Sequence, residues 1–294
     1  MDKRDVSRAE RPSPGKKRGS RLRHHNFLGG LAGWLWLIVV LLPIYWIVIT
    51  SFKVQSDYYA TNPLLPPTSP TLENYRFVLE NDFVRYFVNS VIVTVGSVGP
   101  AVLVSFMAAY AIVRGSAASR FLRGVNGLFL MGLAIPLQAV IIPIYLIIIK
   151  LQMYDTLGAI ILPSLAFAIP LSVLVLGNFV RDVPKELFES MRMDGATEWG
   201  TLWRLAFPLT RPALVTVTIY QGLTVWNGFI LPLILTQSPE QRTLPLALWS
   251  FQGQYSVNIP AVLASVVLTT LPILTLYIIG RRQLLSGLTA GFSK

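Results

Sequence analysis

Acidic side chains, which could act as acids, bases or ligands, gather in one part of this sequence. Five of the 14 Asp and Glu residues lie between Arg181 and Pro212, in the stretch RDVPKELFESMRMDGATEWGTLWRLAFPLTRP. Other reactive side chains are scarce, because the chain has no cysteine and its two histidines, His24 and His25, both lie in a basic N-terminal segment. This composition excludes a disulfide, a thiolate metal site, a cysteine nucleophile and a His-based catalytic centre in the body of the protein.

The pattern of this stretch predicts two short amphipathic helices rather than an acid–base pair. Asp182 and Pro184 are start signals for the first helix, and Gly195 ends it where a positive φ is needed. Thr197 caps the second helix, and Pro208 is expected to end it. The apolar faces of the two helices hold Leu187, Phe188 and Met191, then Trp199, Leu202, Trp203 and Ala206. About 25 residues of this kind are too polar to cross a bilayer, yet their apolar faces need to be covered.

Composition places the rest of the chain in a membrane. Of the 294 residues, 53% are hydrophobic and 13% are charged, whereas soluble domains carry about 25% charged residues. Six apolar segments are long enough to cross a bilayer: 28–51, 88–113, 125–149, 157–180, 213–236 and 259–280. The first segment is too long for the core of a cleaved signal peptide, so it is expected to remain as a span. The predicted fold class is an all-α integral membrane protein with six transmembrane helices.

The distribution of basic residues predicts the orientation of these spans. With the N-terminus inside, 20 of the 25 Lys and Arg residues are cytoplasmic, and only Lys53, Arg76, Arg85, Lys150 and Arg242 are external. This bias predicts that both termini are cytoplasmic, and it accounts for the net charge of +11 without a nucleic-acid partner. Residues 1–27 are therefore read as a basic cytoplasmic tail against anionic membrane lipids, and residues 28–294 as one membrane domain.

The acidic stretch resembles the EAA loop of ABC importer permeases. In that pattern Glu189 matches the Glu, Ser190 and Met191 replace the two alanines, and Gly195 matches the Gly. The segment LAFP, which ends at Pro208, matches the family's I-x-L-P, and the D-G-A of residues 194–196 resembles the carbohydrate branch. Further similarity lies in PTLENYRFVL, YFVNSVIV, IPLQAVIIPIY, WNGFILPLIL and the C-terminal SGLTAGFSK. The resemblance covers nearly the whole chain apart from its N-terminal tail.

This resemblance implies a type I ABC importer permease in a bacterial cytoplasmic membrane, which is a transport subunit and not an enzyme. The loop of residues 181–212 would dock in a groove of a cytoplasmic ATPase, and the C-terminal residues 286–294 would reach the same partner. The implied coupling residues are Leu187, Glu189, Met191, Asp194, Gly195, Ala196, Trp199 and Pro208.

Implied partners are a second permease, forming a heterodimer, an ABC ATPase dimer and an extracellular solute-binding protein. ATP and Mg²⁺ would bind to the ATPase, since this chain has no phosphate-binding G-x-x-x-x-G-K-[ST] loop and needs no cofactor of its own. The alternative for the loop is that it packs only beneath the chain's own spans.

The predicted spans contain no Asp, Glu, Lys or Arg, which argues against a proton-coupled carrier. A neutral sugar, oligosaccharide or polyol would be recognised by hydrogen-bonding and aromatic groups. Candidates along its pathway are Asn89, Gln138, Tyr145, Tyr220, Gln221, Trp226 and Asn227. Each of these could instead serve an interhelical hydrogen bond or an interfacial position. The competing functions are a permease for another small solute, a secondary carrier working alone and a membrane enzyme acting on lipid-linked sugar.

Overall fold

The computed structural model describes residues 27–115, 119–248 and 258–290, and all secondary structure in these residues is helical. The predicted tail of residues 1–27 lies outside them, except that α1 (Phe27–Ser51) begins at its last residue. The chain forms two units, Met1–Ile44 and Tyr45–Lys294, and apart from α1 every feature discussed below belongs to the second. The prediction of an all-α fold is confirmed.

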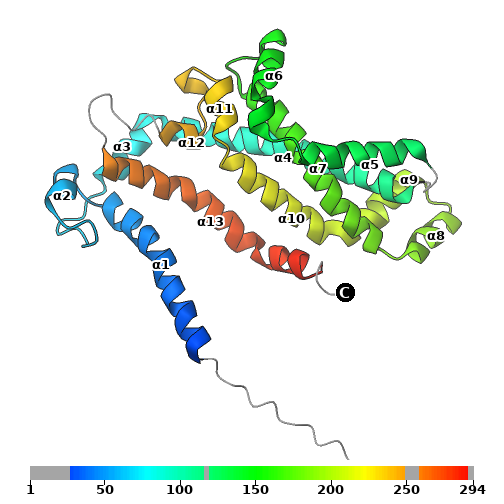
Figure 1. The fold of residues 1–294 in the computed structure, drawn as a ribbon, viewed down its shortest axis with the longest axis horizontal. Helices are drawn as coiled ribbons and strands as arrows, with labels where there is room; N and C mark the ends of the chain where they lie inside the picture. Colours follow the sequence, from blue (N-terminus) through cyan, green and yellow to red (C-terminus); the bar gives the residue numbers. More distant parts are fainter. Residues whose placement is uncertain (1–26, 116–118, 249–257, 291–294) are drawn as a thin grey trace, which may run out of the picture. The chain divides into compact units, whose positions relative to one another are not determined.

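All six predicted spans are helical over most of their length (Figure 1). After α1 and the short α2 (Gln55–Ala60), α3 (Glu73–Val78) leads through a kinked turn into α4 (Val84–Arg114). The fourth predicted span is α7 (Leu157–Asp182), and the sixth begins α13 (Ile259–Ala290). Among the described residues three segments, 29–51, 73–114 and 157–182, are each long and apolar enough to cross a membrane, and a bent helix pair is a fourth if it is counted as one span. A shorter apolar segment, 259–275, is found in the described part of α13.

The third predicted span is not one straight helix. It consists of α5 (Arg120–Leu133) and α6 (Leu137–Lys150), which meet at an angle of 105°. Pro136 occupies the cap of α6, and a proline disfavours helical conformation in the residue before it. The prediction of a continuous helix over 125–149 is therefore wrong, because apolarity alone does not reveal a break of this kind.

The fifth predicted span is displaced toward the N-terminus and is also interrupted. α10 begins at Phe207, well before residue 213, and ends at Trp226, where Asn227 is its cap. The chain then bends before α11 (Ile230–Leu235), so the apolar run over 213–236 is divided between two helices. A short 3₁₀ turn (Pro239–Gln241) and α12 (Leu244–Ala247) follow in the described part of the segment after α11.

The core is built on α4, α7 and α10, with α13 packed against α10. Two hydroxyls bridge α4 to α7: Ser97 Oγ donates to the Ile161 carbonyl and Ser105 Oγ to the Ile169 carbonyl, both at 3.3 Å. The donors are eight residues apart, as are the acceptors, so the same contact recurs about two turns along the helix pair. Small hydroxyl residues allow helices to approach closely in a membrane, and these bonds fix the register of the two spans.

Candidate functional site

The turn of the predicted coupling loop is a well-formed Schellman motif. α8 (Lys185–Met193) ends at Asp194, and Gly195 follows with φ +77°. The Gly195 amide donates to the Arg192 carbonyl at 3.0 Å, and the Ala196 amide donates to the Met191 carbonyl at 2.9 Å. These two bonds satisfy the last carbonyls of α8 and reverse the chain. The expectation that Gly195 supplies a positive φ is confirmed.

The start of α8 differs in one detail from the prediction. Asp182 is the last residue of α7 and does not cap α8, whose cap is Pro184. Thr197 does cap α9 (Glu198–Thr201), and its hydroxyl accepts a hydrogen bond from the Gly200 amide at 3.1 Å.

Pro208 does not end the second helix, contrary to expectation. A π-helical segment, Leu202–Ala206, follows α9 and runs directly into α10 (Phe207–Trp226), with Pro208 in its first turn. A proline removes one N–H donor and crowds the carbonyl four residues earlier, and the wider π turn accommodates this. The second half of the loop is therefore continuous with a membrane helix, so a displacement of the loop moves α10 with it.

One face of the loop packs on the protein's own spans. Phe188 is 1% exposed and lies 6.3 Å from Tyr110 of α4, measured between ring centroids. The Arg114 guanidinium lies 3.9 Å from the centre of the Phe188 ring, a cation–π contact. Trp203 packs against Phe106 of α4 at 6.2 Å. The buried side chains Leu202 and Ala206 complete this cluster, as their helical spacing predicted.

A carboxylate also ties the loop to α4. Glu198 accepts a hydrogen bond from the Tyr110 hydroxyl at 2.8 Å, and it accepts two from Arg192, the shorter at 2.6 Å. The Tyr110 bond and then the Arg192 bonds hold the pKa of Glu198 below its ordinary value of 4.5. Glu198 thus joins the two helices of the loop to each other and to a span. Its partner Tyr110 lies 88 positions away in the sequence, so only the structure reveals this contact.

The opposite face of the loop carries apolar side chains that stay largely exposed in the described part of the chain. The exposed fractions are 40% for Leu187, 89% for Met193 and 59% for Trp199. Glu189 and Asp194 are also exposed, whereas Met191 and Ala196 are half-buried. Packing beneath the chain's own spans therefore accounts for one face of the loop and leaves the other face available.

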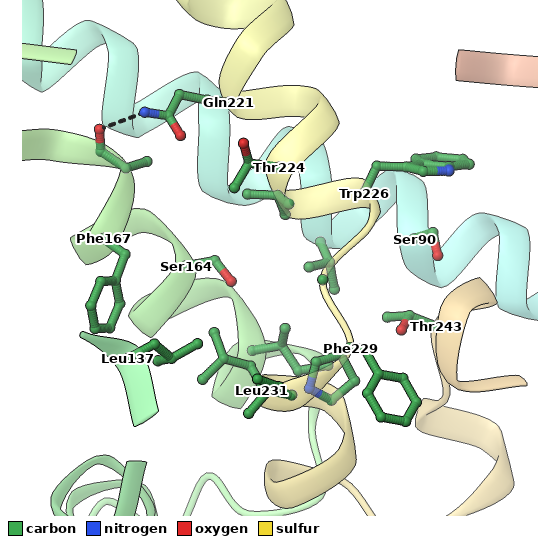
Figure 2. Close-up of a pocket in the computed structure, with 17 residues that line it drawn as sticks. Ser90, Leu137, Ser164, Phe167, Gln221, Thr224, Trp226, Phe229, Leu231 and Thr243 are labelled. Carbon is green, nitrogen blue, oxygen red and sulfur yellow. Dashed lines mark hydrogen bonds between the residues drawn. The ribbon is translucent and has the colours of Figure 1, made fainter. Parts of the chain in front are cut away.

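A cavity of about 340 Å³ lies among α4, α7, α10, α11 and the residue that precedes α12 (Figure 2). Two residues proposed from the sequence line it, Gln221 and Trp226. The Gln221 amide donates to the Ala168 carbonyl at 3.1 Å and to the Ser172 hydroxyl at 3.3 Å. The Trp226 indole packs edge-on against Phe87, with 5.8 Å between the ring centroids.

The other proposed pathway residues lie elsewhere. Asn89 is buried and donates to the Glu240 and Arg242 carbonyls at 2.7 and 2.9 Å, so it fastens the segment that follows α11 to α4. Asn227 donates to the Leu223 carbonyl at the end of α10. Tyr145 packs edge-on against Tyr154 at 5.7 Å. Gln138 and Tyr220 are exposed and do not line the cavity.

Sequence analysis missed the hydroxyl and phenyl groups of the cavity. Ser164 and Phe167 come from α7, Phe229 from the break after α10, and Thr243 from the residue before α12. Single Ser and Thr residues are common in membrane helices, so only the three-dimensional arrangement distinguishes them. Among the described residues, no group of three or more His, Cys, Asp or Glu side chains could hold a metal ion.

Comparisons with known proteins agree with this architecture. Residues 101–284 match the family model described as "Binding-protein-dependent transport system inner membrane component". The permease of the diacetylchitobiose uptake system of Streptomyces coelicolor is 34% identical over 258 residues, which cover 87% of this chain and 93% of that protein. The permease of the arabinooligosaccharide transport system of Halalkalibacterium halodurans is 32% identical over 260 residues, covering 86% and 91%.

A solved structure shows the same fold. It is a chain of a bacterial ABC transporter involved in the import of alginate, with a TM-score of 0.78 and 21% identity, and the match covers 92% of this chain and 99% of that one. Together with the family match over more than half of the sequence, these relatives settle the class of the protein. The chain belongs to the inner-membrane components of binding-protein-dependent transport systems, which are the non-enzymatic permease subunits of ABC importers.

Proposed function

We propose that this chain is one permease of an ATP-driven importer for a sugar or oligosaccharide, and that the loop of residues 181–212 couples it to a cytoplasmic ATPase. The observation that carries the coupling role is the two-sided loop. Its inner face is anchored through Phe188 and Glu198, while Leu187, Met193 and Trp199 stay exposed on a rigid turn. Exposed apolar side chains that alternate with carboxylates on a fixed helix pair are typical of a protein-docking surface.

The continuity of the loop with α10 gives this docking a mechanical consequence. A partner that closes beneath the membrane and carries α8 with it pulls on α4 through Glu198, and on α10 through the uninterrupted helix. Rigid-body movement of packed helices is an established way to change the access of a pathway. ATP bound to the partner would supply the energy, and this chain would transmit the movement and form part of the pathway.

The substrate class follows from the relatives and from the cavity. The two permeases named above belong to uptake systems for diacetylchitobiose and arabinooligosaccharides. The residues that line the cavity are uncharged, which suits a neutral solute rather than an ion. A second permease forming a heterodimer, an ATPase dimer, an external binding protein and cytoplasmic placement of both termini are parts of the same proposal.

The test is reconstitution of the chain with its genomic neighbours. The candidate ATPase, second permease and binding protein would be co-expressed, and uptake of radiolabelled diacetylchitobiose, trehalose and maltose would be measured in proteoliposomes. ATP-dependent uptake that requires the binding protein and fails when the loop's Trp199 and Leu187 are both replaced by Ser supports the proposal. Uptake that needs neither ATP nor a second chain would overturn it.

A further inference from the structure

The cavity is too large to be a packing defect, and hydroxyl and amide side chains line it at selected points. Protein interiors contain few voids larger than a water molecule, whereas this space measures about 340 Å³. That volume falls at the small end of the range of about 300 to 1,000 Å³ seen for small-molecule sites. It lies where α10 breaks before α11, so the chain bends around it (Figure 2).

Polar groups reach the cavity from three separate segments. Thr243 is 4% exposed, and its hydroxyl has no hydrogen-bond partner among the described residues. Ser164, from α7, is 9% exposed, and Figure 2 shows its hydroxyl directed into the space. Gln221, from α10, uses its amide nitrogen on Ala168 and Ser172, which leaves the amide oxygen as an acceptor beside the cavity. A buried hydroxyl without a partner is costly, so a ligand that bonds the Thr243 hydroxyl would relieve that cost.

Two phenyl rings complete the arrangement. Phe167 of α7 and Phe229 after α10 both line the cavity, together with aliphatic side chains. Apolar walls with a few convergent hydroxyl and amide groups suit a ligand that is apolar on its faces and polar around its edge. A pyranose ring has that distribution, since its C–H groups lie on the faces and its hydroxyls lie at the rim. A lipid chain would leave the Thr243 hydroxyl unpaired.

We propose that this cavity is a transport subsite for one ring of a neutral sugar, held within this subunit by Thr243, Ser164 and Gln221 and flanked by Phe167 and Phe229. This inference rests on the proposed function and adds to it that this chain contacts the substrate directly, rather than only lining the path of a substrate held by its partner. It also replaces Asn89, Gln138, Tyr145 and Tyr220 as the expected contact residues.

The experiment uses the natural absence of cysteine in the chain. A Ser164→Cys variant, which is close in size to serine, is reconstituted with its partner subunits and treated with a small maleimide. The labelling rate of this chain is read by mass spectrometry, both without nucleotide and with ATP and the binding protein. The added sugar is whichever of diacetylchitobiose, trehalose and maltose the wild-type complex takes up. The matched control is Thr218→Cys, which lines a different hollow between α4 and α10.

The transported sugar should slow labelling of Ser164→Cys about tenfold at ten times its dissociation constant, and it should leave Thr218→Cys unchanged. Adding Thr243→Val to Ser164→Cys should weaken sugar affinity about fivefold, because one hydrogen bond is lost, so that the same sugar concentration slows labelling only about threefold. Thr236→Val should not weaken the affinity, since that buried hydroxyl bonds its own helix at Pro232 and does not line the cavity.

The inference is overturned if the transported sugar leaves the Ser164→Cys labelling rate unchanged in both states. It is overturned equally if that variant is never labelled while it still transports, because the cavity would then be closed to solutes. In both cases ATP-dependent uptake by the wild-type complex would persist, and the proposed function would stand. Absence of uptake of every sugar tested would instead count against the proposed function itself.

Discussion

Substitution of Gly195 is the sharpest perturbation of the coupling loop, because its free-energy cost comes only from the backbone conformation. A Cβ added at this position would meet no atom within 4 Å, yet the backbone has φ +77°. Holding an L-residue in this left-handed region costs roughly 1–2 kcal/mol, more for β-branched residues and less for Asn. The two hydrogen bonds of the turn contribute about 1 kcal/mol each. The strain that Ala introduces is therefore comparable to the stabilisation from these two hydrogen bonds. The strain that Val introduces is larger than that stabilisation.

We expect Gly195→Asn to transport near the wild-type rate, Gly195→Ala to be slower and Gly195→Val to be slowest, at least about tenfold below wild type. Membrane levels measured by immunoblot should stay equal, because the spans are untouched, while ATP-driven sugar uptake falls in that order. Gly200→Ala is the matched control in the same loop, since Gly200 lies in α9 and its added Cβ makes only an ordinary contact at 3.4 Å. Wild-type uptake by Gly195→Val, or equal damage from Asn and Val, would refute the reasoning.

Three further outcomes follow from the same geometry. Phe188→Ala should destabilise the subunit by roughly 3–5 kcal/mol and lower its melting temperature in detergent. Leu187→Ala should leave the melting temperature unchanged and weaken ATPase binding. Equal melting temperatures for both variants would contradict the assignment of Phe188 to the inner face and Leu187 to the outer face. Because the pKa of Glu198 is lowered in the folded loop, its stabilisation is present above the ordinary value of 4.5 and is lost as the pH falls through the lower folded value. Protection of residues 185–206 against hydrogen exchange, measured relative to the intrinsic exchange rate at each pH, should therefore fall at acid pH in the wild type and be low at neutral pH in Glu198→Gln; wild-type protection that does not change with pH would argue against the carboxylate bridge. Deleting residues 287–294 should preserve membrane insertion but reduce binding-protein-stimulated ATP hydrolysis, and full activity of the truncated complex would show that this end is dispensable.

Local signals in the sequence were sufficient for the coupling loop. Gly195 was assigned a positive φ because it follows an amphipathic segment, and Thr197 was assigned as a cap because it precedes one; the structure confirms both. The error at Pro208 arose because a proline after a helical stretch reads as a terminator. The π-helical segment before it, which lets the helix continue into α10, leaves no comparable signal in the sequence.

Longer-range features could not be predicted from one sequence. The 105° bend between α5 and α6 and the break after Trp226 interrupt apolar runs that look continuous. Asn89 was predicted to lie along the substrate pathway, whereas in the structure its side chain binds carbonyls 151 and 153 positions away. The cavity is lined by both Ser164 and Thr243, and neither residue differs in sequence context from an ordinary membrane serine or threonine.

The most direct test of the account is co-purification followed by transport. An affinity-tagged version of this chain, extracted in mild detergent after co-expression with its genomic neighbours, should bring down a second permease and an ABC ATPase. The purified complex should take up sugar in proteoliposomes only with ATP and the binding protein, and Gly195→Val should abolish most of that uptake. Isolation of the chain without an ATPase, together with sugar uptake driven by an ion gradient alone, would contradict the central claim.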